Sequence, residues 1–261
     1  MRRKDVPMTS ERNIFVFSNN EGVADFAVNK WLKISSQAFA DKGYFSAALS
    51  GGKTPVYFCR RLVVSKNIVS WDNIHIFLAD ERFVPPYDKE SNYGLIKEHL
   101  LNHVKIPDEN VHRIPTEGIT LERSARRYEE DIRRFFRSEG DSIPQFDLIM
   151  LGIGEDGHTA SLFPGASSLT VTERLAIAMT TDRIPHNRIS LSLPVLINAK
   201  QIIFLVSGVN KARVLKEILE NRKSPLPAAL VQRKSKTAYF VIDQGAASLL
   251  SDRGRTNSEI L

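Results

Sequence analysis

The stretch that decides the fold class is Phe146–Gly165, which reads FDLIMLGIGEDGHTASLFPG. It begins with a short apolar run, Phe146–Leu151, in which only Asp147 is polar. Such runs are typical of strands that are buried on both faces of a parallel sheet. Glycines, Asp156 and His158 follow directly. Because ligands of open parallel sheets bind beyond the carboxyl ends of the strands, the stretch predicts a buried strand that ends in a functional loop.

Segments with strand and helix patterns alternate along the rest of the chain. Strands are expected at Asn13–Phe17, Tyr44–Leu49, Ile74–Ala79, Val111–Ile114, Phe146–Leu151, Leu175–Met179, Arg188–Leu193, Gln201–Val206 and Ala238–Ile242. Helices are expected from Asn20, as the capping residue, to Lys42, from Pro55 onward, and at Ser91–Leu101, Thr120–Arg137 and Gly208–Leu219. This alternation predicts a modified Rossmann-like, doubly wound α/β fold, with a mostly parallel sheet and helices on both faces. We expect one domain over residues 13–251, with a flexible N-terminus (1–12) and a polar C-terminal tail (252–261).

The composition excludes several classes of protein. The chain has 261 residues, of which 42% are hydrophobic, as in globular proteins. Its single cysteine, Cys59, excludes an intramolecular disulfide and favours a reducing compartment; its apolar neighbours predict an inert thiol in the core. No apolar run approaches the ~20 residues that span a membrane, and no apolar segment follows the basic N-terminus. We therefore expect a cytoplasmic protein with no membrane partner.

The positive charge of the chain allows attraction to partners that carry phosphate, and an ordinary basic surface is the alternative. The net charge is +6 and the isoelectric point is near 9.4, which would attract groups that carry phosphate. In Arg123–Arg137, however, Arg alternates with Glu and Asp, as on the solvated face of a helix. The sequence contains no basic groove pattern with interleaved aromatic residues, so nucleic acid is not expected as a partner.

Polar clusters follow three of the expected strands: Ser50–Thr54, Asp80–Arg82 and Gly154–His158. Since parallel strands end at one edge of a sheet, the clusters are expected to share one pocket. In the first cluster the glycines allow close approach of the backbone, and a helix that begins near Pro55 adds its positive end. A phosphate suits such a turn, although an ordinary strand-to-helix turn is the alternative for the Gly-Gly pair alone. The spacing fits neither a Walker loop nor a dinucleotide fingerprint.

His158 is a candidate base. It is expected at the start of a short helix over Thr159–Phe163, where the helix dipole would disfavour the imidazolium and keep the ring neutral at pH 7. A structural histidine is the alternative, but polar residues flanked by glycines at the end of a strand are typical of a site. Ser161 is interpreted as a residue of that helix, because no GxSxG elbow surrounds it.

A metal site is not expected. The other histidines are scattered along the chain. His99 and His103 have helical spacing but lack the glutamate of an HExxH motif, so they are interpreted as a surface pair. No metal ligand is assigned.

Three motifs together resemble the 6-phosphogluconolactonase family: SGGKTP at Ser50–Pro55, DERFVP at Asp80–Pro85 with Ser91-Asn92 after it, and GIGEDGHTASLFPG at Gly152–Gly165. They stand in the order of that family, which shares a superfamily with glucosamine-6-phosphate deaminases. The resemblance implies hydrolysis of 6-phospho-D-glucono-1,5-lactone to 6-phospho-D-gluconate in the oxidative pentose phosphate pathway. It also implies a small phosphosugar lactone as the partner and no metal or organic cofactor.

The resemblance implies roles for single residues as well. His158 would be the general base that activates water, Asp156 would help to orient it, and Arg82 would stabilise the developing oxyanion. The substrate would be bound by Ser50, Gly51, Gly52 and Thr54 along the turn, by Arg188 and Lys211 at the phosphate, and by Asp80 at the sugar hydroxyls.

Two other functions stay open. The deaminase branch typically continues the DGH motif with IAFNEP, whose glutamate assists ring opening, whereas this chain reads TASLFP and has no carboxylate there. A non-catalytic sugar-phosphate-binding protein is the second alternative; it predicts loss of His158 or Arg82, and both are present. The sequence does not fix the oligomeric state: a monomer is expected, with a weak dimer as the alternative.

Overall fold

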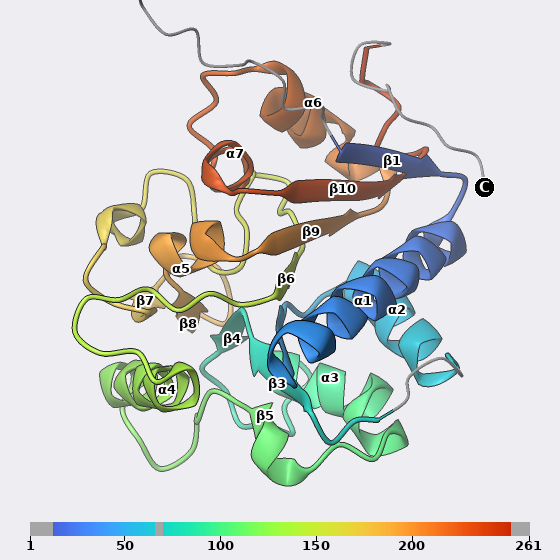
Figure 1. Cartoon of the computed structure of the whole chain (residues 1–261). Coiled ribbons are helices and arrows are strands. Elements are labelled where there is room, and N and C mark those ends of the chain that lie inside the picture. The colour runs from blue at the N-terminus through green and yellow to red at the C-terminus, as the bar shows by residue number, and fades with distance from the viewer. Residues whose placement is uncertain (1–12, 66–69, 252–261) are drawn as a thin grey trace, which may run out of the picture.

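A seven-stranded parallel sheet forms the centre of the computed structural model, which describes residues 13–65 and 70–251 (Figure 1). Across the sheet the strands are β1 (Asn13–Phe17), β10 (Ala238–Asp243), β9 (Gln201–Val206), β6 (Leu148–Leu151), β2 (Phe45–Leu49), β3 (Ile74–Leu78) and β5 (Val111–His112). All neighbouring strands in it are parallel. The expected α/β fold is confirmed, while the predicted flexible N-terminus (1–12) and polar tail (252–261) lie outside the described residues.

The order of the strands reverses between β2 and β6. From β2 the sheet continues through β3 to β5, whereas β6, β9 and β10 extend it in the opposite direction. Leu49 in β2 pairs with Leu78 of β3 and with Met150 of β6, so these three strands end at about the same level. A crevice forms at such a reversal, because the connections leave toward opposite sides. The loops after β2 and β6 border this crevice.

Helices cover both faces of the large sheet. They are α1 (Asn20–Lys42), α2 (Lys53–Val63), α3 (Asn92–His99), α4 (Leu121–Phe136), α5 (Leu193–Asn198), α6 (Ala212–Glu220) and α7 (Pro227–Lys234). Figure 1 shows α1 and α2 on one side of the sheet and α4 and α5 on the other. Every residue of β2 is buried, and Trp31 of α1 packs edge-on against Phe45, with ring centroids 4.8 Å apart. This burial on two sides explains the uninterrupted apolar runs in the sequence.

A second, antiparallel sheet consists of β4 (Asp80–Arg82), β8 (Asn187–Leu191) and β7 (Ala176–Thr180). β4 follows β3 after a single residue, and its Arg82 pairs with Arg188 of β8. The sequence predicts β7 and β8 as strands, but not that they leave the parallel sheet, because composition and period do not report the partner of a strand. The small sheet thereby brings two arginines to the edge of the crevice.

The helix ends follow capping chemistry, with one shift from the prediction. α1 is capped by Asn19 rather than Asn20, since Asn19 Oδ1 accepts the N–H of Gly22 at 3.0 Å. α4 begins after Thr120, whose hydroxyl accepts the N–H of Arg123 at 3.3 Å. The sequence does not predict α5, because six residues are too few for a periodic pattern.

Candidate active site

The three polar clusters meet in one pocket of about 470 Å³ at the carboxyl edge of the large sheet. Of the predicted residues, those that line it are Ser50, Gly51, Gly52, Thr54, Asp80, Arg82, His158, Arg188 and Lys211. Asp156 is not part of this lining; it contacts His158 and lines an adjoining depression with Arg183. The predicted convergence of the three strand ends is confirmed.

The turn Ser50–Thr54 joins β2 to α2 and borders the pocket with its backbone. Gly52 has a φ of +115°, which favours glycine. A β carbon on Gly51 would lie 1.9 Å from Asn92 Oδ1, so no side chain fits there. Ser50 is only 5% exposed, and its hydroxyl has no partner within the described part of the chain. An unpaired buried hydroxyl costs about 1–3 kcal/mol, which a polar ligand would recover.

His158 and Asp156 form a close pair on the loop after β6. His158 Nδ1 lies 2.5 Å from Asp156 Oδ1. Burial alone would raise the pKa of Asp156, but its close pairing with His158 and the charge of Arg183 outweigh burial and lower this pKa. The carboxylate is therefore ionised and only accepts, so Nδ1 carries the proton and Nε2 keeps its lone pair. Among the described residues Nε2 has no hydrogen-bond partner, and His158 can act as a base through this atom.

The neutral state of His158 has a different cause from the predicted one. The short helix predicted over Thr159–Phe163 is absent; this segment forms a tight turn, closed by backbone hydrogen bonds between Thr159 and Leu162. This segment therefore contributes no helix dipole to the ring. Instead, burial lowers the pKa of His158 below its ordinary value, against the opposing charge of Asp156. The prediction of a helix is wrong, and burial provides the neutral ring.

Four cationic residues line the pocket: Lys53, Arg82, Arg188 and Lys211. Arg82 donates through Nη1 to the carbonyl of Glu90 at 2.7 Å, which fixes its guanidinium. The Nε atoms of Arg82 and Arg188 are buried and have no acceptor among the residues described. Burial lowers the pKa of Arg188 and of Lys211, which indicates that both cations are partly removed from water. Such donors suit an anionic ligand.

Asp80 stands at the start of β4 and is 5% exposed. Its Oδ2 accepts the hydroxyl of Ser161 at 2.7 Å, and its Oδ1 accepts Nδ2 of Asn92 at 3.3 Å. The placement of Ser161 on a helix is therefore wrong: it is fully buried in the tight turn and orients a carboxylate of the pocket. The predicted binding of sugar hydroxyls by Asp80 stays a prediction.

Sequence reasoning missed two residues: Asn92, which lines the pocket, and Glu81, which holds the start of α3 beside it. Glu81 is 1% exposed and accepts the N–H groups of Asn92 and Tyr93 at 2.7 Å each. Burial raises the pKa of Glu81 to about 7, although these N–H groups oppose the rise. Asn92 donates to the carbonyl of Asp80 at 2.9 Å, and its Oδ1 is buried beside the pocket without a donor from the described residues. The sequence shows Asn92 soon after the DER motif, but not that α3 begins at the pocket.

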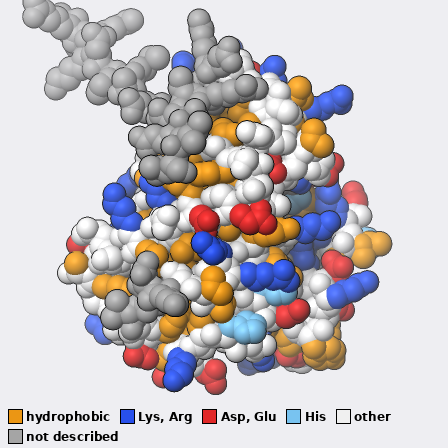
Figure 2. Space-filling view, turned by 90° about the vertical axis from the view of Figure 1, so that its right-hand side faces the viewer, with side chains coloured by type: hydrophobic (Ala, Val, Ile, Leu, Met, Phe, Trp, Pro, Cys, Tyr) orange, Lys and Arg blue, Asp and Glu red, His pale blue; other side chains and the backbone are white. Residues whose placement is uncertain are grey.

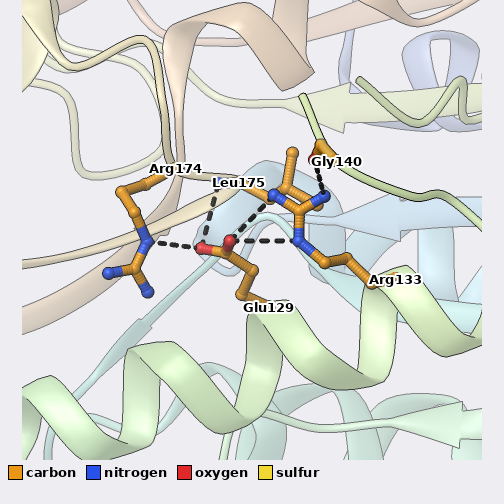
Figure 3. A network of polar contacts seen from close by, with 5 residues as sticks. All are labelled: Glu129, Arg133, Gly140, Arg174 and Leu175. Atoms are coloured by element: carbon orange, nitrogen blue, oxygen red, sulfur yellow. Dashed lines mark hydrogen bonds and ion pairs between the residues drawn. The ribbon is translucent and has the colours of Figure 1, made fainter. Parts of the chain in front are cut away.

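Glu129 of α4 anchors the small sheet (Figure 3). One of its oxygens accepts Nη2 of Arg133 at 3.0 Å, and the other accepts Nε of Arg174 at 2.7 Å and the N–H of Leu175 at 3.2 Å. Arg133 also donates to the carbonyl of Gly140 at 2.8 Å. Because Leu175 directly precedes β7, this network holds the small sheet, which carries arginines of the pocket, against α4.

A larger cavity of about 900 Å³ has a lining drawn from α4, from β7, from the loop between β6 and β7 and from the loop between β7 and β8. Its lining includes no histidine and no glycine turn at the end of a parallel strand. The donors and the base described above line the smaller pocket, which is therefore the candidate active site.

Predictions outside the pocket can also be compared with the structure. Cys59 is buried, and burial raises the pKa of its thiol to about 12, as expected for an inert thiol. Within the described residues, no three His, Cys, Asp or Glu side chains gather as metal ligands, and no helix is long and apolar enough to cross a bilayer. On the face shown in Figure 2, Lys and Arg side chains are interspersed with Asp and Glu rather than gathered in one basic field.

The fold and the pocket define an open-sheet α/β enzyme that binds a small anionic substrate where the strand order reverses. A family model described as glucosamine-6-phosphate isomerases/6-phosphogluconolactonase matches residues 18–240. The chain belongs to this family. Relatives named 6-phosphogluconolactonase include the human protein, 40% identical over 79% of this chain and 81% of its own length. The Synechocystis protein is 36% identical over 82% of this chain and 88% of its own.

Solved structures agree with this assignment. The 6-phosphogluconolactonase from Trypanosoma brucei has a TM-score of 0.83 at 26% identity, covering 92% of this chain and 99% of that chain. The Thermotoga maritima 6-phosphogluconolactonase has a TM-score of 0.77 at 32% identity, covering 89% and 100%. A monomeric glucosamine-6-phosphate deaminase, at 22% identity and a TM-score of 0.75, shares the fold.

Proposed function

We propose that the protein hydrolyses 6-phospho-D-glucono-1,5-lactone to 6-phospho-D-gluconate. Relatives named 6-phosphogluconolactonase, at 34% to 40% identity over most of this chain, support the activity. The observation that carries the proposal is one pocket that combines His158 with Arg82 and Arg188. Among the described residues, Nε2 of His158 has no hydrogen-bond partner, and the buried Nε donors of the two arginines have no acceptor. A base and fixed cations are what hydrolysis of a phosphorylated lactone requires.

The reaction follows from these groups. Nε2 of His158 takes a proton from water as the water oxygen attacks C1 of the lactone. The guanidinium of Arg82 donates to the oxyanion that develops on the carbonyl oxygen, and the loss of one such donor typically costs about 2.7–4 kcal/mol of transition-state stabilisation. The bond between C1 and the ring oxygen then breaks, and the imidazolium returns its proton to that oxygen, which becomes a hydroxyl. The new carboxylic acid loses its proton to water.

Binding of the phosphate positions the ring. Lys211 and Arg188 gather the phosphate, and the Ser50–Thr54 turn lines the remainder of the substrate site. Asp80 accepts from a sugar hydroxyl. Because a δ-lactone is already an activated ester, an oriented water and a stabilised oxyanion suffice, and the proposed steps need no metal or organic cofactor.

The test follows the loss of freshly prepared lactone by NMR and compares purified protein with spontaneous hydrolysis. We expect acceleration by the protein, and a kcat lower by about 10²–10⁴-fold in His158→Ala with KM within a few-fold. Ammonia release from glucosamine 6-phosphate without loss of lactone would instead identify a deaminase. Binding of 6-phosphogluconate without either lactone hydrolysis or ammonia release would identify a sugar-phosphate-binding protein.

The cytoplasmic location, the single domain over residues 13–251 and the monomeric state, with a weak dimer as the alternative, belong to this proposal as well. Sedimentation of the purified protein over a range of concentrations tests the oligomeric state.

A further inference from the structure

Arg183 reaches His158 and Asp156, the proposed catalytic pair, from a different part of the fold. It lies between β7 and β8, and its Nη2 donates to Oδ2 of Asp156 at 2.6 Å. The other oxygen of the same carboxylate, Oδ1, contacts Nδ1 of His158 at 2.5 Å. Arg183 therefore holds the carboxylate through the oxygen that the imidazole does not use.

A second path of contacts joins Arg183 to the imidazole through Phe163. The guanidinium carbon of Arg183 lies 5.5 Å from the centroid of the Phe163 ring, and that ring lies 4.7 Å from the imidazole of His158. Arg188 lies over the same ring at 5.8 Å. The imidazole is thus held at Nδ1 by Asp156 and on one side by Phe163, and Arg183 contacts both of these residues.

Arg183 is placed to act through the pair rather than on the substrate. Its side chain is 52% exposed, and it lines the adjoining depression and the larger cavity of about 900 Å³, but not the candidate active-site pocket. The charged groups that line the pocket and the depression around the imidazole are Asp80, Glu155, Asp156, Lys53, Arg82, Arg183, Arg188 and Lys211. Asp156 and Asp80 favour the imidazolium, and Arg183 opposes it.

We infer that Arg183 is a positioning residue for the proposed reaction, which fixes Asp156 and Phe163 and through them orients His158. The inference rests on the proposed function. A general base must point its lone pair at the proton that it abstracts. A ring held on two sides adopts few orientations in which the lone pair points elsewhere. The positive charge of Arg183 also disfavours the imidazolium, which keeps Nε2 available at lower pH.

The experiment compares Arg183→Met and Arg183→Lys with the wild-type protein. The matched control is Arg113→Met, because Arg113 also donates to a carboxylate, of Glu117 at 2.8 Å, and lies 5.6 Å from the Tyr93 ring, but is outside the pocket. For each protein, kcat and KM are measured against pH, and the imidazole pKa of His158 is measured by NMR without substrate. Thermal unfolding reports whether the fold is kept.

Arg183→Met is expected to lower kcat about 10-fold or more with KM within a few-fold. The acid limb of kcat/KM and the NMR pKa of His158 should both rise by about half a unit to one unit. Arg183→Lys should keep the wild-type acid limb and recover part of kcat, and Arg113→Met should match the wild type. An Arg183→Met protein with wild-type kcat, or with reduced kcat but an unchanged pH limb and NMR pKa, overturns the inference. Failure of the wild type to consume lactone would refute the proposed function alone, because the NMR measurement needs no turnover.

Discussion

Gly154 allows the close packing of His158 and Asp156, the proposed catalytic pair, and its replacement by alanine should disable the enzyme without unfolding it. A β carbon at this position would lie 2.0 Å from Nδ1 of His158 and 2.6 Å from Oδ1 of Asp156. Since carbon and nitrogen atoms in contact lie at about 3.5 Å, the imidazole must move by more than about 1 Å. The φ of Gly154 is not in the left-handed region, so the backbone itself tolerates alanine.

A displacement of about 1 Å at a reacting group costs on the order of 10²-fold in rate, which corresponds to about 2.7 kcal/mol. We therefore expect Gly154→Ala to lower kcat by about 10²-fold in the lactone assay. KM should stay within a few-fold, because the proposed phosphate ligands, Arg188 and Lys211, are not displaced. The free energy of unfolding in urea should change by much less than the value of about 2.7 kcal/mol that the loss of rate represents.

A double-variant comparison separates an effect through His158 from a general defect. If Gly154→Ala acts by moving the imidazole, it should cost little more in a His158→Ala background, where there is no ring to move. Losses that multiply in the double variant, or a single Gly154→Ala protein with wild-type kcat, would refute the steric reasoning.

Four further outcomes can be measured. Lys211→Ala should raise KM several-fold and change kcat little, provided that it binds the phosphate equally in the ground and transition states; a fall in kcat alone would contradict the phosphate role. Glu129→Gln should lower the free energy of unfolding in urea by about 1–3 kcal/mol, since Arg174 and the N–H of Leu175 lose a charged acceptor, and an unchanged midpoint would show that the network in Figure 3 is not stabilising. Burial and then the nearby His112 lower the pKa of His75 to about 4. Its contribution to stability is therefore present above about pH 6.5 and is lost as the pH falls toward 4. The free energy of unfolding in urea should be lower at pH 5 than at pH 7.5, and His75→Leu should reduce this difference between the two pH values. EDTA should leave the rate of lactone hydrolysis unchanged, and a chelator-sensitive rate that zinc or magnesium restores would contradict the metal-free steps.

Local sequence was sufficient to predict the parts of the site that follow strands. Ser50–Thr54 and Gly154–His158 each combine a buried strand, a glycine turn and polar side chains within a few consecutive residues, so their position at the carboxyl edge follows from the strand direction alone. The absence of a carboxylate after His158, where the deaminase branch has a glutamate, could likewise be recognised from the sequence alone. The short helix after His158 was predicted incorrectly, because a turn such as Thr159–Leu162 depends on contacts from elsewhere, among them the hydrogen bond from Ser161 to Asp80.

The sequence by itself determined the chemistry of the pocket: the histidine, the flanking glycines and the cations, with the strands that carry them. Only the tertiary structure decided how the catalytic pair is held. Arg183 lies 27 residues from Asp156 in the chain, and Ser161 lies 81 residues from Asp80, yet each pair forms a hydrogen bond. Contacts between such distant residues are set by how the small sheet and the loop after β6 pack together, and no local pattern in the sequence reports that packing.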